Sequence, residues 1–248
     1  MPTVQLFVTC LIDTFYPQVG EAVVDILSRL GVSVDFAPSQ TCCGQPNFNA
    51  GLRDDARRMA KHMIEVFEGT AKSPDFARSD IVSPSGSCVH MIRVNYPELF
   101  ADDSAWLPRA QSLAARTFEF SEYLVDHLNV TDVGARWDGT LTYHPSCHLA
   151  RGLGIDRQPR ALLGSVRGAH VVELPHADEC CGFGGIFSVV HPEVSKEMLV
   201  NKISNLEKSE APTLVNPDAG CLMHIAGGLH RQGKSQRAVH LAEVLCSK

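Results

Sequence analysis

A pattern of four cysteines occurs twice in the sequence, and it constrains the fold more than any other feature. Cys10, Cys42, Cys43 and Cys88 make the first set, and Cys147, Cys180, Cys181 and Cys221 follow them at offsets of 137, 138, 138 and 133 residues. Each adjacent pair is followed by glycine, in "TCCGQP" at 41–46 and in "ECCGFGG" at 179–185. Self-similarity of this kind predicts two homologous halves, which we place at residues 1–130 and 131–248.

The segments that flank the cysteines support the repeat. "VSPSGSC" at 82–88 shares its Val, Pro and Cys with "VNPDAGC" at 215–221, and a proline, Pro38 or Pro175, precedes each adjacent pair. Between the halves, "NVTDVGARWDG" at 129–139 carries two glycines and interrupts the periodicity. We therefore predict a linker there.

Each half predicts alternating strands and helices. The apolar run at 4–12 is typical of a strand buried on both faces. Pro17 begins a helix, and apolar spacing predicts another helix at 52–67. Further strands are predicted at 32–36, 80–85, 140–144, 170–174 and 212–216, with a helix at 193–208. This alternation predicts an α/β fold with a small, largely parallel sheet and packed helices in each half.

The predicted strands explain where the cysteines lie. Cys10, Cys88, Cys147 and Cys221 stand at or just beyond the carboxyl ends of strands, and each Cys-Cys-Gly follows a strand and precedes a helix. Ligands of open α/β sheets bind at this edge. We therefore expect two clusters of cysteines, one in each half.

Composition excludes several classes of protein. The net charge of −6 argues against a nucleic-acid-binding protein, which is usually basic. No apolar run approaches the roughly 20 residues of a transmembrane helix, so we expect no transmembrane segment. The start of the sequence has no features of a signal peptide. Nine cysteines in such a chain favour a reducing compartment, the cytoplasm, and metal or redox chemistry over structural disulfides.

The cysteine spacing narrows the chemistry. Four converging thiolates are typical of zinc or iron–sulfur sites. Structural zinc sites usually have two Cys-x-x-Cys elements, and this sequence has none. Adjacent cysteines do not easily occupy two corners of one tetrahedral site, but they can bind different irons of a larger cluster. The pattern therefore favours a polynuclear centre, with glycine allowing close backbone approach.

The same motifs resemble a known family. Two blocks of the form Cys…Cys-Cys-Gly…Cys are similar to the cysteine-rich CCG domain proteins, which include one of the subunits of heterodisulfide reductase and the iron–sulfur subunit of glycolate oxidase. The resemblance covers essentially the whole chain and is greatest to the short lactate-utilisation A proteins. It rests on "LFVTC" at 6–10, "CCGQP" at 42–46, "SPSGSC" at 83–88, "YHPSCHLAR" at 143–151, "CCGFGG" at 180–185 and "HLAEVL" at 240–245.

The resemblance implies an iron–sulfur subunit of a multi-subunit, cytoplasmic complex that oxidises L-lactate, a small 2-hydroxy acid, to pyruvate. Each repeat would hold one iron–sulfur cluster of the 4Fe–4S kind. One cluster would bind Cys10, Cys42, Cys43 and Cys88, and the other Cys147, Cys180, Cys181 and Cys221. The implied partners are a ferredoxin-like iron–sulfur protein and a third small subunit. The resemblance assigns no catalytic residue to this chain.

The sequence departs from the family pattern at one point in each block. The family usually ends a block with Cys-x-x-Cys, but the last position is Met91 in the first block and His224 in the second. Imidazole is a good iron ligand, so His224 is a candidate nitrogen ligand, whereas we expect Met91 to pack in the core.

Two other functions remain open at this point. One is a heterodisulfide- or thiol-reducing subunit, and the other is a zinc-binding scaffold without catalysis. His90, His144 and His148 lie near cysteines and could donate hydrogen bonds to sulfur or relay protons, and Arg151 could attract a carboxylate. Structural roles are the simpler reading of these four residues. Cys246 has no counterpart in the other half and is expected to lie outside both clusters.

Overall fold

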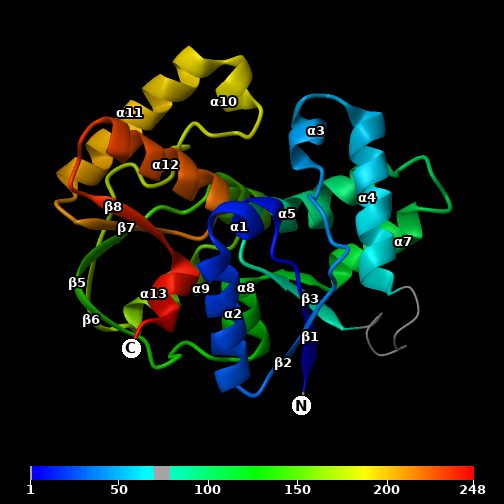
Figure 1. Ribbon diagram of the computed structural model, residues 1–248, viewed down its shortest axis with the longest axis horizontal. Coiled ribbons are helices and arrows are strands. Elements are labelled where there is room, and N and C mark those ends of the chain that lie inside the picture. The colour runs from blue at the N-terminus through cyan, green and yellow to red at the C-terminus, as the bar shows by residue number, and fades with distance from the viewer. Residues whose placement is uncertain (1, 70–78) are drawn as a thin grey trace.

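Two four-stranded parallel sheets form the centre of the molecule (Figure 1). The computed structural model describes residues 2–69 and 79–248. The first sheet has the order β2-β1-β3-β4, with β1 at Thr3–Leu6, β2 at Ser33–Phe36, β3 at Asp80–Ser83 and β4 at Thr117–Glu119. The second has the order β6-β5-β7-β8, with β5 at Arg136–Tyr143, β6 at Arg167–Val172, β7 at Thr213–Asn216 and β8 at Arg237–His240. The predicted α/β fold with one parallel sheet in each half is confirmed.

Helices connect the strands and pack on the sheets; the segments labelled η are π-helices. In the first half they are α1 at Cys10–Phe15, α2 at Pro17–Arg29, α3 at Gln45–Asn49, α4 at Arg53–Glu68, α5 at Gly86–His90, η2 at Met91–Asn95, α6 at Tyr96–Leu99, α7 at Leu107–Ala115, α8 at Phe120–Glu122 and η3 at Tyr123–His127. The second half has η4 at His148–Gly152, α9 at Arg157–Gly164, α10 at Phe187–Val190, α11 at Pro192–Lys208, α12 at Ala219–Arg231 and α13 at Leu241–Cys246. No helix in the described ranges is long and apolar enough to cross a membrane.

The amphipathic helices form where the apolar spacing predicts them. Helix α2 begins at Pro17, whose fixed φ suits the first turn, and it buries Val19, Val23, Ile26 and Leu27. Helix α4 buries Ala56, Ala60, Met63, Ile64 and Phe67 on one side. In the second half, α11 covers the predicted range 193–208.

Three details of the predicted elements are wrong. The strand expected at 4–12 ends at Leu6, because the backbone turns at Thr9, which has a φ of 72°, and α1 begins at Cys10. The apolar run continues past Leu6 because Ile12 is buried on helix α1. In a run this short, apolar periodicity does not distinguish a helix from a strand. The linker expected at 129–139 is too long, since β5 already begins at Arg136 and pairs with Arg167. Strands β4 and β8 were not predicted.

The two halves share a hydrophobic core. One cluster joins residues of both, among them Val4, Leu6, Leu141 and Leu241, and α13 packs on α2 of the first half. Two smaller clusters each belong to one half, and each includes that half's own cysteines: Cys43 and Cys88 in one, Cys181 and Cys221 in the other. The division at residues 130 and 131 stays a prediction, because the shared core ties the halves together.

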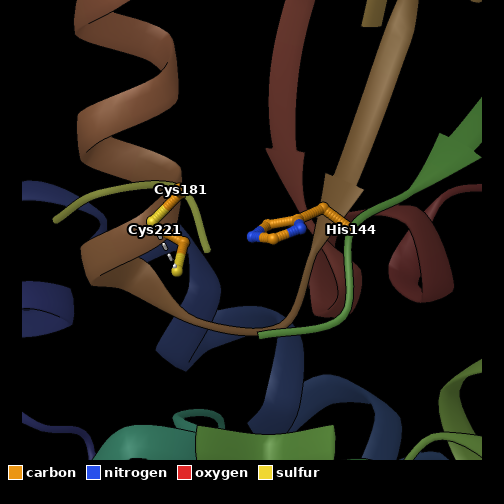
Figure 2. Close-up of side chains that lie close together, drawn as sticks. All are labelled: His144, Cys181 and Cys221. Carbon is orange, nitrogen blue, oxygen red and sulfur yellow. Dashed lines mark hydrogen bonds between the residues drawn. The ribbon is translucent and has the colours of Figure 1, made fainter. Parts of the chain in front are cut away.

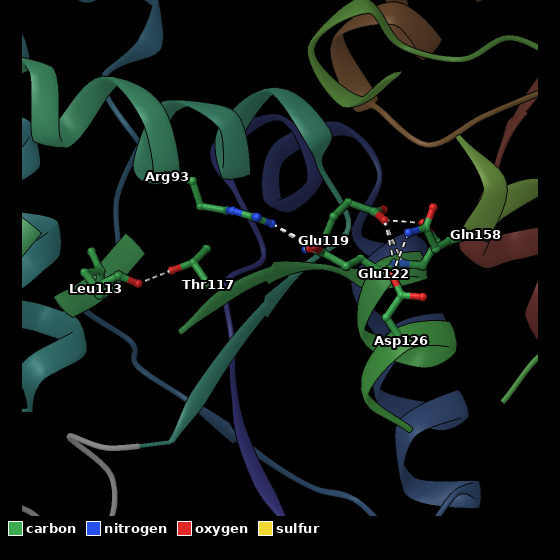
Figure 3. A network of polar contacts seen from close by, with 8 residues as sticks. Arg93, Leu113, Thr117, Glu119, Glu122, Asp126 and Gln158 are labelled. Carbon is green, nitrogen blue, oxygen red and sulfur yellow. Dashed lines mark hydrogen bonds and ion pairs between the residues drawn. The ribbon is translucent and has the colours of Figure 1, made fainter. Parts of the chain in front are cut away.

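Polar contacts also join the halves. Asp218 accepts hydrogen bonds from the backbone N–H of Ser87 at 2.8 Å and from Ser85 Oγ at 3.3 Å. Elsewhere, Gln158 donates to Asp126 at 2.6 Å, beside the network around Glu119 and Glu122 (Figure 3). Buried donors and acceptors that pair across an interface fix how the two surfaces meet.

His240 makes a further contact of this kind. The His240 side chain is 1% exposed; its Nδ1 accepts from the N–H of Ala242 at 3.1 Å, and its Nε2 donates to the carbonyl of Pro84 at 3.0 Å. Burial lowers the pKa of His240 to about 4. The neutral ring therefore holds the end of β8 against the first half.

We expect acid to destabilise this interface through His240. Because the pKa of His240 is lower in the folded chain than its ordinary value of 6.5, its stabilising effect is complete above pH 6.5 and is lost as the pH falls toward about 4. Between these values the free energy of unfolding should fall by about 3 kcal/mol more in the unaltered chain than in His240→Asn, which does not titrate. Urea unfolding of both metal-free proteins at several pH values measures this difference. Equal pH dependence in the two proteins would contradict the assignment.

Candidate metal centres

The first cysteine group gathers at the carboxyl edge of the first sheet. Cys10 follows β1 and begins α1, Cys88 lies in α5 after β3, and Cys42 and Cys43 lie in the loop that precedes α3. The sulfurs of Cys43 and Cys88 are 3.4 Å apart. Hydrogen bonds from the thiols of Cys10 and Cys43 lower the pKa of Cys42 to about 3. All four side chains therefore converge.

The second group repeats this arrangement. Cys147 precedes η4, Cys180 and Cys181 lie in the loop after β6, and Cys221 lies in α12 after β7. The sulfurs of Cys181 and Cys221 are 3.1 Å apart. Hydrogen bonds from the thiols of Cys147 and Cys181 lower the pKa of Cys180 to about 2, and the N–H of Gly182 also donates to its sulfur at 3.4 Å.

The order of the strands explains the convergence. Strands β1 and β3 are neighbours, but the chain runs from β1 to β2 on one side and from β3 to β4 on the other, so these two connections go in opposite directions along the sheet. In the second sheet the connections from β5 to β6 and from β7 to β8 diverge in the same way. Such a reversal leaves a crevice outside the carboxyl ends of the strands, where ligands bind. Cysteines that are far apart in sequence meet in that crevice.

The glycine after each cysteine pair has a structural reason. Gly44 has a φ of 86° and Gly182 a φ of 91°, a region that residues with a Cβ rarely adopt. A Cβ on Gly182 would lie 2.6 Å from the carbonyl oxygen of Ser195, and one on Gly44 would lie 3.3 Å from Met59 Cβ. Glycine therefore lets each loop lie directly against the long helix that follows, α4 or α11.

Both groups face one cavity. A cavity of about 260 Å³ is lined by all eight repeated cysteines, together with Ser85, Ser146 and Asp218. The eight cysteines are free thiols. Cys246 lies elsewhere, as expected, with its sulfur 3.3 Å from Asp25 Oδ2. The two candidate centres therefore face a common space between the halves.

The donor atoms fit the metal centres that the sequence predicts. Each group offers four thiols, and soft sulfur donors select zinc, copper(I) or iron–sulfur clusters over hard cations. Close sulfur–sulfur contacts without disulfides place the ligands of each group within reach of one inorganic core. The geometry does not by itself distinguish zinc from an iron–sulfur cluster.

The histidines near the cysteines take different positions. His148 Nδ1 is 3.7 Å from Cys147 Sγ, and its ring contacts that of His90, with centroids 5.0 Å apart. His224 Nε2 is 3.3 Å from Ser195 Oγ. Its role as a metal ligand stays a prediction. At the matching position of the first half, Met91 is fully buried in the core, as expected.

His144 is the donor whose position the sequence did not predict. Its ring points toward Cys181 and Cys221 (Figure 2), and the donor atoms of these three residues lie within 4.8 Å of one another. Burial lowers the pKa of His144 to about 3, so the ring is neutral. The sequence showed only that His144 lies three residues before Cys147. Its closeness to Cys181 and Cys221 depends on how β5 and β7 pair.

Comparisons with known proteins agree with this architecture. The chain is 50% identical over 245 residues to lactate utilization protein A of Exiguobacterium sp. strain AT1b, with 99% of this chain and 97% of that protein covered. It is 46% identical over 245 residues to lactate utilization protein A of Geobacillus sp. strain WCH70, with 99% of each chain covered. A crystal structure of a hypothetical protein from Helicobacter pylori superposes with a TM-score of 0.67 at 10% identity. That match covers 98% of this chain and 48% of the other and shows the fold alone.

The family comparison matches each cysteine block separately. The model of the cysteine-rich domain CCG matches residues 4–93 and again residues 141–226. Each match contains one complete set of four cysteines, and together they extend over more than half of the chain. The chain therefore belongs to the CCG cysteine-rich domain family, with the domain present twice.

Proposed function

We propose that this protein is the iron–sulfur subunit of a cytoplasmic oxidoreductase complex that oxidises L-lactate to pyruvate. The observation that carries the proposal is the convergence of two complete four-thiol groups on one cavity. The full-length similarity to proteins named for lactate utilization supports lactate as the substrate. In this proposal the chain works with a ferredoxin-like iron–sulfur protein and a third small subunit.

Each group would hold one cluster, of the 4Fe–4S kind. The ligands are Cys10, Cys42, Cys43 and Cys88 in the first half, and Cys147, Cys180, Cys181 and Cys221 in the second. Once bound, the clusters supply one-electron transfer. The chain itself provides thiolates at Cys42 and Cys180, whose low pKa values keep them ready to bind metal. The N–H of Gly182 donates to the Cys180 sulfur, a contact of the kind that helps to set a cluster's potential.

Electron transfer suits this chain better than hydride transfer. Oxidation of lactate releases two electrons and two protons, and the sequence contains no G-x-G-x-x-G pattern of a dinucleotide-binding loop. "GFGG" at 182–185 lacks that spacing, and its first glycine instead lies against α11. We therefore assign the chain the transfer of electrons, with the partner subunits completing the complex.

The shared cavity favours one alternative, a subunit that reduces heterodisulfides or other disulfides. Two centres that face the same space could each receive one sulfur of a disulfide substrate. A zinc scaffold is a further alternative, because Cys181, Cys221 and His144 also make a donor set that zinc accepts. Metal analysis and substrate tests separate these possibilities.

The first test is the metal content. Protein made and purified without oxygen should contain iron and acid-labile sulfide, and the double variant Cys42→Ser with Cys43→Ser should lose about half of both, because only one of the two centres loses ligands. Cys246→Ser is the matched control and should retain the full content. Stoichiometric zinc without iron or sulfide would reject the cluster. Complete loss of iron in the double variant would show that the two centres are not independent.

The second test is the substrate. The complex of this chain with its two proposed partners should reduce an artificial acceptor when L-lactate is added, whereas the isolated chain should show little activity, because it supplies only the electron-transfer centres. The double variant Cys180→Ser with Cys181→Ser should abolish the lactate-dependent rate. Anaerobic assays with L-lactate, D-lactate and a mixed disulfide measure this specificity. Reduction of the disulfide without any response to lactate would favour the alternative.

A further inference from the structure

The two cysteine groups have different neighbours at equivalent positions. Phe7 and His144 each stand three residues before the first cysteine of their block. Their backbones are held alike: Phe7 N–H donates to the carbonyl of Val82 at 2.9 Å, and His144 N–H donates to that of Val215 at 3.0 Å. Phe7 packs edge-on against Phe67 in an apolar cluster, with ring centroids 5.6 Å apart. One half therefore has a hydrocarbon where the other has an imidazole.

The long helices show the same difference. Ala56 and Met59 of α4 lie beside Gly44, and Ser195 and Met198 of α11 lie beside Gly182. These matching contacts align α4 with α11. Four residues further along, Met63 on α4 corresponds to Lys202 on α11. Lys202 is fully buried, and its Nζ donates to the carbonyls of His176 and Ala177 at 2.9 and 3.4 Å. The second half thus has His144 and Lys202 where the first half has Phe7 and Met63.

The tautomer of His144 follows from its hydrogen bond. Its Nδ1 lies 3.3 Å from the carbonyl oxygen of Ala177, and a carbonyl can only accept, so Nδ1 carries the proton. In a neutral ring the other nitrogen then has a free lone pair. This atom, Nε2, is buried and has no hydrogen-bond partner in the described part of the chain. One ring nitrogen of His144 lies within 4.8 Å of the sulfurs of Cys181 and Cys221, and the ring nitrogen farther from the backbone points toward them (Figure 2).

The position of His144 is rigid. Its side chain is completely buried, its N–H is bonded to β7, and its own carbonyl accepts from Asn216 Nδ2 at 2.8 Å. In metal-binding histidines one ring nitrogen usually donates to a backbone carbonyl or carboxylate, and the other, which carries no proton, binds the metal. The ring of His144 has this arrangement. A buried acceptor without a hydrogen-bond partner lowers the stability of the fold, and a metal ion bound to the acceptor removes this cost.

We propose that His144 Nε2 is a nitrogen ligand of the second centre, so that this centre has four thiolates and one imidazole while the first has sulfur ligands alone. The inference rests on the proposed iron–sulfur centres and does not depend on lactate as the substrate. His224, in contrast, places its Nε2 beside the Ser195 hydroxyl. The fifth ligand of the second centre thus comes from the segment that precedes Cys147, and not from the position after Cys221.

This donor set makes the two centres electronically unequal. Both centres have four thiolates, and the second centre alone adds a neutral nitrogen donor. Phe7 offers no such donor to the first centre. A nitrogen ligand therefore distinguishes the second centre from the first.

Pulsed EPR of the unaltered holoprotein tests the ligand directly. Protein with histidine labelled by nitrogen-15 should show the nitrogen coupling of a directly bound imidazole in one of its two cluster signals, and the lines should change with the isotope. His144→Phe should abolish this coupling. The substitution places at 144 the residue that the first half has at position 7. His224→Phe, the matched control, should keep the coupling.

The outcomes separate the inference from the proposed function. Iron and sulfide at both centres with no histidine coupling in the labelled, unaltered protein would overturn the His144 ligand alone, whether or not the variant folds. Coupling that persists in His144→Phe and disappears in His224→Phe would overturn it in favour of His224. Protein without iron or sulfide would reject the clusters and the ligand together.

Discussion

The parallel pairing at the centre of each sheet determines where the chemistry of this protein lies. Strands β1 and β3, and likewise β5 and β7, are hydrogen-bonded neighbours that end at the same edge. Each is followed within a few residues by a cysteine in a helix or directly before one: Cys10, Cys88, Cys147 or Cys221. Without this pairing, thiols 78 or 74 positions apart in the chain would not meet. The glycine loops then add the adjacent cysteines by lying flat on α4 and α11.

The shared core gives the duplicated sites a common cavity. Helix α13 of the second half packs on α2 of the first, and Asp218 and His240 reach across to the segment that leads to Cys88. The contacts that orient the halves therefore lie beside the cysteine groups. A change in the relative position of the halves would move the two cysteine groups with respect to each other, so the fold couples the spacing of these groups to the packing of the interface.

The sequence predicted where the cysteines lie in the fold better than it predicted their surroundings. Cysteine positions, glycine positions and long amphipathic helices are properties of local sequence, and all could be recognised in advance. The end of β1 at Leu6 could not, because an apolar run of nine residues suits a strand or a strand followed by a buried helix. The strands β4 and β8 were not recognised in advance either. The cavity and the orientation of His144 depend on contacts between distant segments, which one sequence does not show.

The comparison of Phe7 with His144 shows how a duplicated site can diverge without a change of fold. Both residues hold equivalent backbone hydrogen bonds to the neighbouring strand, so the position accepts either ring. The cost of burying an imidazole is reduced in the second half alone, because the Ala177 carbonyl accepts from Nδ1 and polar residues replace the apolar ones of α4. Phe7 packs against Phe67 in an apolar cluster instead. The cysteines are thus common to both halves, and the difference between the two groups lies in the side chains beside them.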